Sequence, residues 1–522
     1  MAKKQAKEKT IEVALWETAN KLRGTVEPSQ YKHVVLALIF LKFASDKFEE
    51  QRQKLIDDGK EKYVERPEFY NMNNVFFLKE ETRWTYIVSQ ARQNDISLII
   101  DSALHTIEED NEALKGALPN NYFSSLGLDT SKLAALISEI DSIDTLKDKE
   151  QDVIGRIYEY FLSKFAIAEG KGKGEFYTPK SIVNLIVELI EPYKGFIYDP
   201  CCGSGGMFVQ SIKFIEAHHG NQKEVSIYGQ ENINTTYKLA KMNLAIRGIS
   251  ANLGEKAANT FSNDLHKDLK ADFIMANPPF NQKVWREENE LLDDPRWKGY
   301  EVPPKSNANY GWILHMASKL SENGVAGFLL ANGALSGGGD EYKIRKQLIK
   351  NDLVEAILIL PQNMFYTTNI SVTLWILNKN KKEYVRAIHQ RNYRDRQKEI
   401  LFMDLREMGE PFEKKYIQFS EKDIRKIADT YHSWQCTDEL NSPYQDIPEF
   451  CYSAGIEEVR EKDYSLVPSR YIEFVNRDEE IDFDEKMKTL QQEIGELLQE
   501  EKKSREELLA VFKNLGYKIE LK

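Results

Sequence analysis

The sequence predicts an α/β protein whose core is a mostly parallel, doubly wound β-sheet. Between residues 196 and 377, short strand-like apolar runs alternate with amphipathic helical patterns, which is typical of parallel sheets covered by helices. Residues 11–165 show only helical periodicity and predict an all-helical N-terminal domain. The chain ends in a charged helical pattern with one apolar stripe, which predicts a helical tail.

Length and composition are those of a multidomain globular protein. The 522 residues exceed what one compact core usually holds, and we expect domains at 1–150, 151–475 and 476–522. The four cysteines lack metal-ligand spacing, so we expect no metal site and a reduced, cytoplasmic protein. The apolar run Val34–Leu41 is too short to cross a bilayer, and we expect no membrane segment.

The N-terminal domain is predicted to be a helical bundle without chemistry of its own. Pro28 interrupts the first helical pattern, because proline cannot continue a helix. Further helices are predicted from apolar residues at helical spacing, at Tyr31–Phe48, Trp84–Arg92, Ile96–Ile107, Lys132–Ile143 and Val153–Phe165.

A flexible cationic loop separates this bundle from the next helix. Glycine and lysine alternate over Glu169–Gly174, which disfavours regular structure. The predicted helix Ser181–Ile190 follows, with Thr178 placed as its N-cap and Pro179 in its first turn. The residues just before this helix are Glu175, Phe176, Tyr177, Thr178, Pro179 and Lys180.

The chain is organised around a Gly-rich turn between a strand and a helix. The strand Phe196–Tyr198 leads into Asp199 and Pro200, and the helix Met207–His218 follows the turn. Glycines allow a sharp turn and a close approach of a ligand, since no Cβ stands in the way. Asp199, Ser204, Gly205 and Gly206 are therefore candidate ligand-binding residues. Taken alone, such turns serve many nucleotide-like ligands.

Two further strands end in residues that carry chemistry. The strand from Val225 ends in Glu231, a position at which carboxylates bind ribose hydroxyls in α/β folds; a surface acid is the alternative. The strand Ala271–Ala276 ends in an Asn-Pro-Pro-Phe tetrad at the edge where doubly wound folds place active sites. The candidate catalytic residues are Asn277, Pro278, Pro279 and Phe280.

The remaining α/β pattern contains one long polar insert. Residues 281–309 are long for a loop, so a functional lid or DNA contact is expected there. The helix Trp312–Leu320 and strands at 324–331, 354–360 and 372–377 complete the alternation. Phe365 is a candidate second stacking face, with core packing as an equal alternative. Residues 400–475 carry no motif that we can interpret.

Asp-Pro-Cys-Cys-Gly-Ser-Gly-Gly at 199–206 followed by Asn-Pro-Pro-Phe resembles the amino-group methyltransferases that use S-adenosylmethionine. With Leu15–Gly24 and the Phe-Tyr-Thr-Pro string at 176–179, the chain resembles the methylation (modification) subunit of type I restriction–modification systems. The resemblance implies a Rossmann-like methyltransferase core and adenine-N6 methylation of DNA. It also places Glu175–Lys180 over the methionine end of the cofactor and Asp264 at its adenine, with Asn263 and Asp268 as open alternatives.

The tetrad suits the chemistry that this resemblance implies. The amino lone pair of adenine is delocalised into the ring, so acceptors must bind both N–H protons while the nitrogen rehybridises. The side-chain carbonyl of Asn277 and the backbone carbonyl of Pro278 can do this. Prolines keep the backbone stiff, and Phe280 offers a face on which a flipped-out base stacks.

The resemblance also implies partners. These are double-stranded DNA, a DNA-specificity subunit that binds two modification subunits, and a restriction/translocase subunit. The formal net charge of −12 agrees with another subunit holding most of the DNA, since phosphate neutralisation requires a basic surface. The apolar stripe of the tail either packs on its own domain or docks on the specificity subunit; it comprises Met487, Leu490, Ile494, Leu497, Leu508, Val511 and Leu515.

Three other functions compete with this interpretation. RNA and protein amino or amide methyltransferases use a similar tetrad but lack the N-terminal helical domain. An NAD-dependent dehydrogenase would have no use for Asn-Pro-Pro-Phe, and the turn lacks the full G-x-G-x-x-G spacing. A non-catalytic binding subunit would not need the intact tetrad.

Overall fold

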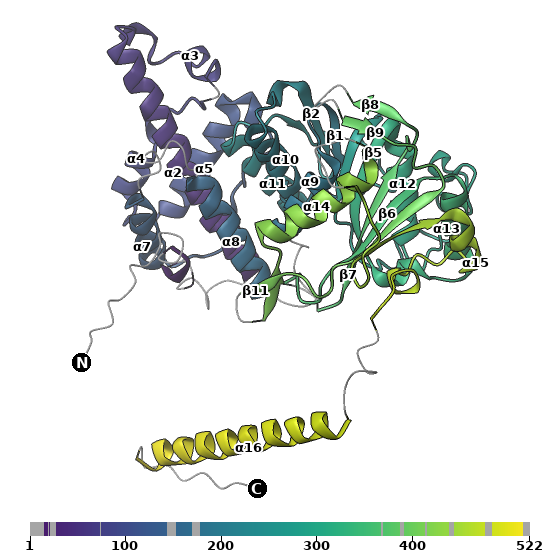
Figure 1. The fold of residues 1–522 in the computed structure, drawn as a ribbon. Helices are drawn as coiled ribbons and strands as arrows, with labels where there is room; N and C mark the ends of the chain where they lie inside the picture. The colour runs from purple at the N-terminus through teal and green to yellow at the C-terminus, as the bar shows by residue number, and fades with distance from the viewer. Residues whose placement is uncertain are drawn as a thin grey trace. The chain divides into compact units, whose positions relative to one another are not determined.

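The computed structural model describes residues 15–18, 20, 28–73, 75–143, 153–169, 178–366, 369–386, 391–412, 415–437, 443–475 and 483–514. The chain divides into two compact units, residues 1–472 and residues 473–522 (Figure 1).

The N-terminal part of the first unit is helical, as predicted. Its longest helix, α2, begins at Pro28 and buries the whole run Val34–Leu41 in the helical core. The helices are α2 (Pro28–Asp57), α3 (Glu68–Asn71), α4 (Trp84–Gln90), α5 (Ile96–Asp110), α6 (Tyr122–Ser125), α7 (Thr130–Asp141) and α8 (Val153–Glu169). Leu239, Met242 and Ile246 of α11 (Asn234–Ile246) belong to the same apolar cluster. The helical part is therefore packed against the sheet domain through α11.

A mostly parallel sheet forms the centre of the molecule and confirms the predicted fold class. In the described residues it has nine strands, in the order β13-β10-β6-β7-β5-β4-β1-β2-β3. Only β7 and β13 run antiparallel to their neighbours. The strands are β1 (Gly195–Asp199), β2 (Val225–Gly229), β3 (Ala251–Asn252), β4 (Ala271–Ala276), β5 (Leu320–Ala331), β6 (Val354–Ile359), β7 (Val372–Asn378), β10 (Glu399–Asp404) and β13 (Cys451–Gly455).

Helices cover both faces of this sheet (Figure 1). Alternate side chains along the strands point to opposite faces, and they belong to two different apolar clusters. In β4, Phe273 and Met275 join one cluster, whereas Ile274 and Ala276 join the other. The first face carries α9 (Lys180–Ile190), α10 (Gly206–Ala217) and α14 (Glu421–Gln435). The second face carries α12 (Asn309–Lys319) and α13 (Gly339–Lys350).

The strand order reverses beside β1. The chain leaves β1 through α10 to reach β2 on one side, whereas β4 pairs with β1 on the other side. In the pairing of β1 with β4, Tyr198 lies opposite Ile274. The residues that follow these two strands, the Gly-rich turn and Asn277, therefore leave the sheet side by side at a topological switch point, where α/β sheets bind ligands.

Residues 400–475, which carry no interpretable motif, extend the sheet and pack on both of its faces. They supply β10, β13 and α14, together with α15 (Ile456–Glu461) and the hairpin of β11 (Glu410–Phe412) and β12 (Tyr416–Gln418). A second hairpin, β8 (Tyr384–Arg386) with β9 (Arg391–Tyr393), precedes them. The stretch thus adds strands to the sheet edge and side chains to both apolar clusters.

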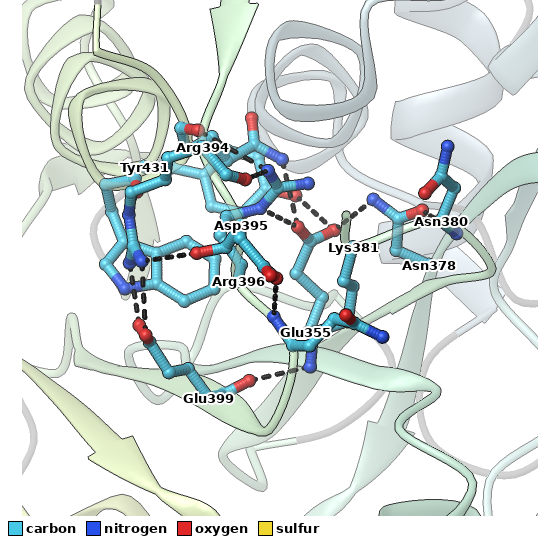
Figure 2. A network of polar contacts seen from close by, with 12 residues as sticks. Glu355, Asn378, Asn380, Lys381, Arg394, Asp395, Arg396, Glu399 and Tyr431 are labelled. Carbon is cyan, nitrogen blue, oxygen red and sulfur yellow. Dashed lines mark hydrogen bonds and ion pairs between the residues drawn. The ribbon is translucent and has the colours of Figure 1, made fainter. Parts of the chain in front are cut away.

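A buried polar network fastens this extension to the sheet (Figure 2). Arg396 Nε lies 3.0 Å from Glu355 Oε1 on β6, and both side chains are 0% exposed. Asn378 Nδ2 and the Tyr431 hydroxyl donate to Glu355 Oε2 at 2.6 and 3.2 Å. Burial by itself would raise the pKa of Glu355, but Arg396 and its other partners hold that pKa below the usual value. The Glu355 carboxylate thus links its own strand, β6, to three other segments of the chain.

Replacing Glu355 with alanine leaves the Arg396 guanidinium buried without its carboxylate. We predict a loss of about 3–5 kcal/mol in the free energy of unfolding, measured by urea denaturation. The matched control is Glu399→Ala, which removes the half-exposed ion pair with Arg394 and is expected to cost about 1 kcal/mol or less. Equal losses in the two variants would contradict the importance of the buried pair.

The second unit contains a single described helix, α16 (Phe483–Asn514). Its apolar residues recur at helical spacing and are exposed: Met487, Leu490, Ile494, Leu497, Leu498, Leu508 and Val511. The predicted stripe is therefore present, except for Leu515, which lies outside the described residues. Such a face requires a partner surface.

Among the described residues, no helix is both long and apolar enough to cross a membrane. All four cysteines are free thiols. In the same part of the chain, no cluster of His, Cys, Asp and Glu side chains is arranged to hold a metal ion.

Candidate active site

The turn after β1 is shaped by two glycines in the left-handed region. Gly203 has φ 54° and Gly205 has φ 79°, conformations that other residues adopt at a cost. A Cβ on Gly205 would lie 3.4 Å from the Leu244 side chain, whereas one on Gly203 or Gly206 would meet nothing within 4 Å. The turn is thus packed on one side and open on the other, so that a ligand can approach the backbone.

Two carboxylates hold this turn from inside. Asp199 Oδ1 accepts the Cys201 N–H at 2.9 Å. Glu231 Oε2 accepts the Gly203 N–H at 3.0 Å, and its Oε1 accepts the Ile233 N–H at 2.8 Å. Asp199 is 2% and Glu231 is 9% exposed. The predicted ligand-binding acids therefore also brace the loop that they flank.

Burial makes the site unfavourable for negative charge. Burial, with a smaller contribution from the neighbouring Glu231, raises the pKa of Asp199 to about 7, against the lowering effect of hydrogen bonds from Cys201. A positively charged ligand group beside these carboxylates would relieve this cost. Burial also raises the pKa of the Cys201 and Cys202 thiols, so neither is a reactive thiolate.

Asn277 directly follows β4, and its side-chain carbonyl oxygen lacks a hydrogen-bond donor. Its side chain is 8% exposed, and its Nδ2 donates to Thr178 Oγ1 at 2.9 Å. Its Oδ1 is buried and has no hydrogen-bond partner. A buried carbonyl without a donor costs free energy, and native proteins rarely keep one without a reason. This oxygen is positioned to accept a hydrogen bond from a ligand.

The predicted N-cap role of Thr178 is wrong. Helix α9 begins at Lys180 with Pro179 as its N-cap residue, and no side chain caps it. The Thr178 hydroxyl instead accepts from Asn277, because the carboxyl end of β4 lies beside the start of α9. A residue that sequence rules assign to helix capping is thus part of the site.

Several of the predicted residues line one small cavity of about 30 Å³. Thr178 and Lys180 reach it from the start of α9, and Ser204 and Gly206 from the Gly-rich turn. Lys180 is exposed, and its Nζ lies 3.7 Å from Oε2 of Glu159 on α8. Glu175, Phe176 and Tyr177 fall outside the described residues.

Phe280, the last residue of the tetrad, is half-buried and meets Phe365 edge to face, with ring centroids 5.6 Å apart and planes at 84°. Phe365 is 2% exposed and belongs to the apolar core. Of its two predicted roles, the structure favours core packing over a second stacking face. The stacking role of Phe280 stays a prediction.

Asp264 is engaged within the protein. Its Oδ2 lies 2.7 Å from Lys319 Nζ, and its Oδ1 accepts the His266 N–H. Burial would raise the pKa of Asp264, but the Lys319 ammonium holds it below the usual value. The adenine contact of Asp264 stays a prediction, and the structure adds no contact that supports it.

Sequence reasoning overlooked residues that support the site indirectly. Asn243 of α11 donates from Nδ2 to the Ser204 carbonyl at 2.7 Å and so fixes the turn. Ile233 is 48% exposed two residues after Glu231, where an apolar side chain offers a face to a planar ring. The apolar residue two positions after the acid was a usable signal in the sequence. The contact of Asn243, by contrast, arises only when α11 packs on the turn.

The insert at 281–309 is packed rather than loose. Trp285 and Trp297 are buried in the apolar core beside α12. Asn309 accepts the Asn281 N–H at 3.1 Å and donates to Asn281 Oδ1 at 3.0 Å. Asn309 thus fixes the residue that follows the tetrad.

The chemistry of these features suits S-adenosylmethionine. The open glycine turn, the buried carboxylates that favour a cation and the unpartnered Asn277 Oδ1 suit a positively charged methyl donor beside an amino-group acceptor. The N-6 DNA methylase family model matches residues 149–480, and the HsdM N-terminal domain model matches residues 11–140. The chain belongs to the N-6 DNA methylase family. Its activity is adenine-N6 methylation of DNA, and its methyl donor is S-adenosylmethionine.

Relatives place it among the methylase subunits of type I restriction enzymes. The HindI methylase subunit of Haemophilus influenzae is 45% identical over 81% of this chain and 92% of its own length. The MjaIX methylase subunit of Methanocaldococcus jannaschii is 37% identical over 97% and 92%. A type I methyltransferase subunit from Streptococcus thermophilus has the same fold, with a TM-score of 0.72 at 24% identity over 89% and 99% of the two chains.

The raised pKa of Asp199 predicts how stability depends on pH in the cofactor-free protein. The folded state holds this proton more tightly than the unfolded state, so the stability is present below about pH 4 and is lost as pH rises toward 7. Between pH 5 and pH 8 we expect wild type to lose about 3 kcal/mol relative to Asp199→Asn, which keeps the acceptor for the Cys201 N–H. Urea unfolding of both proteins at the two pH values measures this, and parallel pH profiles would contradict it.

Proposed function

We propose that this N-6 DNA methylase positions the adenine amino group with Asn277 Oδ1 and the Pro278 carbonyl. The observation that carries the proposal is the buried Oδ1 without a partner, held in place by the Thr178 hydroxyl on the other end of the amide. Hydrogen bonds to both N–H protons let the nitrogen direct its lone pair at the methyl group. The base itself needs no prior deprotonation, since the proton leaves after the nitrogen has become cationic.

The other tetrad residues act on the base and on the backbone. Pro279 and Pro278 keep the strand end stiff, so that the two acceptors are pre-organised. The exposed part of the Phe280 ring stacks on an adenine that has left the duplex. Stacking restricts the base to the plane in which both acceptors can reach its amino group.

The cofactor-binding residues are proposed to be Asp199, Ser204, Gly205, Gly206, Glu231 and Asp264, with Glu175–Lys180 over the methionine end. The methyl donor supplies an activated methyl group on a sulfonium. The turn lets the backbone approach the cofactor, Glu231 accepts hydrogen bonds from its ribose hydroxyls, and the buried carboxylate of Asp199 favours its positive charges. Ile233 offers an apolar face beside Glu231. The protein thus contributes position and electrostatics.

We further propose that the chain works as the modification subunit of a cytoplasmic type I complex on double-stranded DNA. The relatives are methylase subunits of type I restriction enzymes, and the chain covers 92% of the length of two of them. The exposed apolar stripe of α16 is proposed to dock on the specificity subunit. Two modification subunits are proposed to bind each specificity subunit, and a restriction/translocase subunit is a further proposed partner. No observation favours the alternative of RNA or protein methylation.

The Asn277→Ala variant removes the unpartnered acceptor. We predict that kcat for methyl transfer from labelled S-adenosylmethionine to DNA falls by about 10²–10³, while cofactor affinity is kept. The matched pair is Thr178→Val and Thr178→Ser. Thr178→Val removes the hydroxyl that holds the Asn277 amide and is expected to lower kcat about tenfold, whereas Thr178→Ser keeps a hydroxyl and the wild-type kcat. Nucleoside analysis identifies the product, and sequencing of the methylated DNA gives the recognition sequence.

A full rate in Asn277→Ala would exclude the proposed acceptor. Label in RNA or protein instead of N6-methyladenine would move the assignment to the alternative substrate. Equal rates in the two Thr178 variants would show that the hydroxyl does not orient the amide.

The docking of α16 predicts a face-specific loss of assembly. Leu497 is 64% exposed on the apolar stripe, and a charge there opposes burial. We predict that Leu497→Glu abolishes co-purification with the specificity subunit, while Gln499→Glu, about 200° around the helix, leaves it unchanged. Size-exclusion chromatography of the co-expressed subunits measures this, and equal behaviour of the two variants would argue against the stripe.

A further inference from the structure

The insert after the tetrad presents an apolar side chain to solvent at its tip, Lys283 and Val284. Val284 is 78% exposed, far more than most large apolar residues of the described chain. Its φ of 50° lies in the left-handed region, which a β-branched residue rarely adopts. Strained backbone is kept where the surrounding structure enforces it, and such residues gather at functional sites.

The residues before the tip are fixed to the start of α12. The Asn281 N–H donates to Asn309 Oδ1 at 3.1 Å, and the Gln282 carbonyl accepts the Ala308 N–H at 2.9 Å. Asn281 also has a left-handed φ, of 51°. The chain therefore leaves the tetrad along a defined path.

The residues after the tip are anchored inside the insert. Trp285 is 6% exposed and donates from Nε1 to the Pro304 carbonyl at 2.9 Å. Arg286 is 9% exposed and donates from Nη2 to the Pro303 carbonyl at 3.0 Å. The residues on both sides of the tip are thus held by hydrogen bonds, and these bonds keep the Val284 side chain exposed.

We propose that Val284 enters the base stack at the place that the target adenine leaves, and so acts as a positioning residue for base extrusion. The proposal rests on the proposed function. Val284 follows Phe280 by four residues, so their Cα atoms are at most about 14 Å apart. A base stacked on Phe280 stays attached to its DNA strand, and Val284 is close enough to reach that DNA strand. Apolar side chains are the groups that proteins insert between base steps, and the adjacent Lys283 suits a backbone phosphate.

The test uses the complex with the specificity subunit and a short duplex that carries the mapped recognition sequence. One duplex has a normally paired target adenine, a second has the target opposite an abasic site, and a third has 2-aminopurine at the target. Extrusion costs less from the second duplex because the base has no pairing partner. The variants are Val284→Gly, Val284→Ile and the control Leu292→Ala, an exposed apolar residue of the same insert.

For Val284→Gly we expect kcat/KM on paired DNA to fall at least about tenfold, with recovery to within about twofold of wild type on the abasic duplex. The rise in 2-aminopurine fluorescence that reports extrusion should be lost. Val284→Ile and Leu292→Ala should behave as wild type. Glycine adopts the left-handed conformation readily, so Val284→Gly should also unfold at a higher temperature than wild type, which separates lost function from lost folding.

A wild-type fluorescence rise in Val284→Gly, or an equal loss of rate on paired and abasic DNA, would overturn the role of Val284. The proposed function fails in a different way. In that case the wild-type complex would form no N6-methyladenine on either duplex, or Asn277→Ala would remain active on both.

Discussion

The site depends on the parallel pairing of β1 with β4. This pairing sets Tyr198 opposite Ile274, so the Gly-rich turn and Asn277 leave the sheet at neighbouring positions. The turn binds the methyl donor in the proposed mechanism and Asn277 binds the acceptor, so their distance is fixed by backbone hydrogen bonds inside a buried sheet. Such a sheet deforms little, because its interior is close-packed. Methyl transfer needs in-line geometry above all, and a rigid strand pair provides it.

Around this pair, the protein buries polar groups at a free-energy cost that a ligand can relieve. Asp199 is buried with a pKa near 7, and Asn277 Oδ1 has no donor. Both are unfavourable in the cofactor-free protein and become favourable when a cation and an amino group arrive. The Glu355–Arg396 network is the opposite case, since its partners all lie within the chain. The first arrangement serves function, whereas the second serves folding.

Distant parts of the chain meet at the site for physical reasons that no local pattern shows. The Thr178 hydroxyl reaches Asn277 because α9 covers the face of the sheet at which β4 ends. Asn243 fixes the turn because α11 packs between the sheet and the N-terminal helices. Phe365 was an open choice between stacking and packing, and its burial beside Phe280 favours packing. These contacts depend on the packing of helices on the sheet.

The sequence by itself determined the elements and the chemistry. Strand Ala271–Ala276, the helix predicted at Ser181–Ile190 and the glycine turn follow from periodicity and from residues whose backbone preferences are strong. The tetrad and the turn also pointed to the family, since both motifs are local. Only the tertiary structure decided which groups are left unsatisfied. Whether a side chain such as Thr178 caps a helix or orients Asn277 depends on what lies beside it in space, and a hydrogen bond between residues 99 positions apart has no local signal.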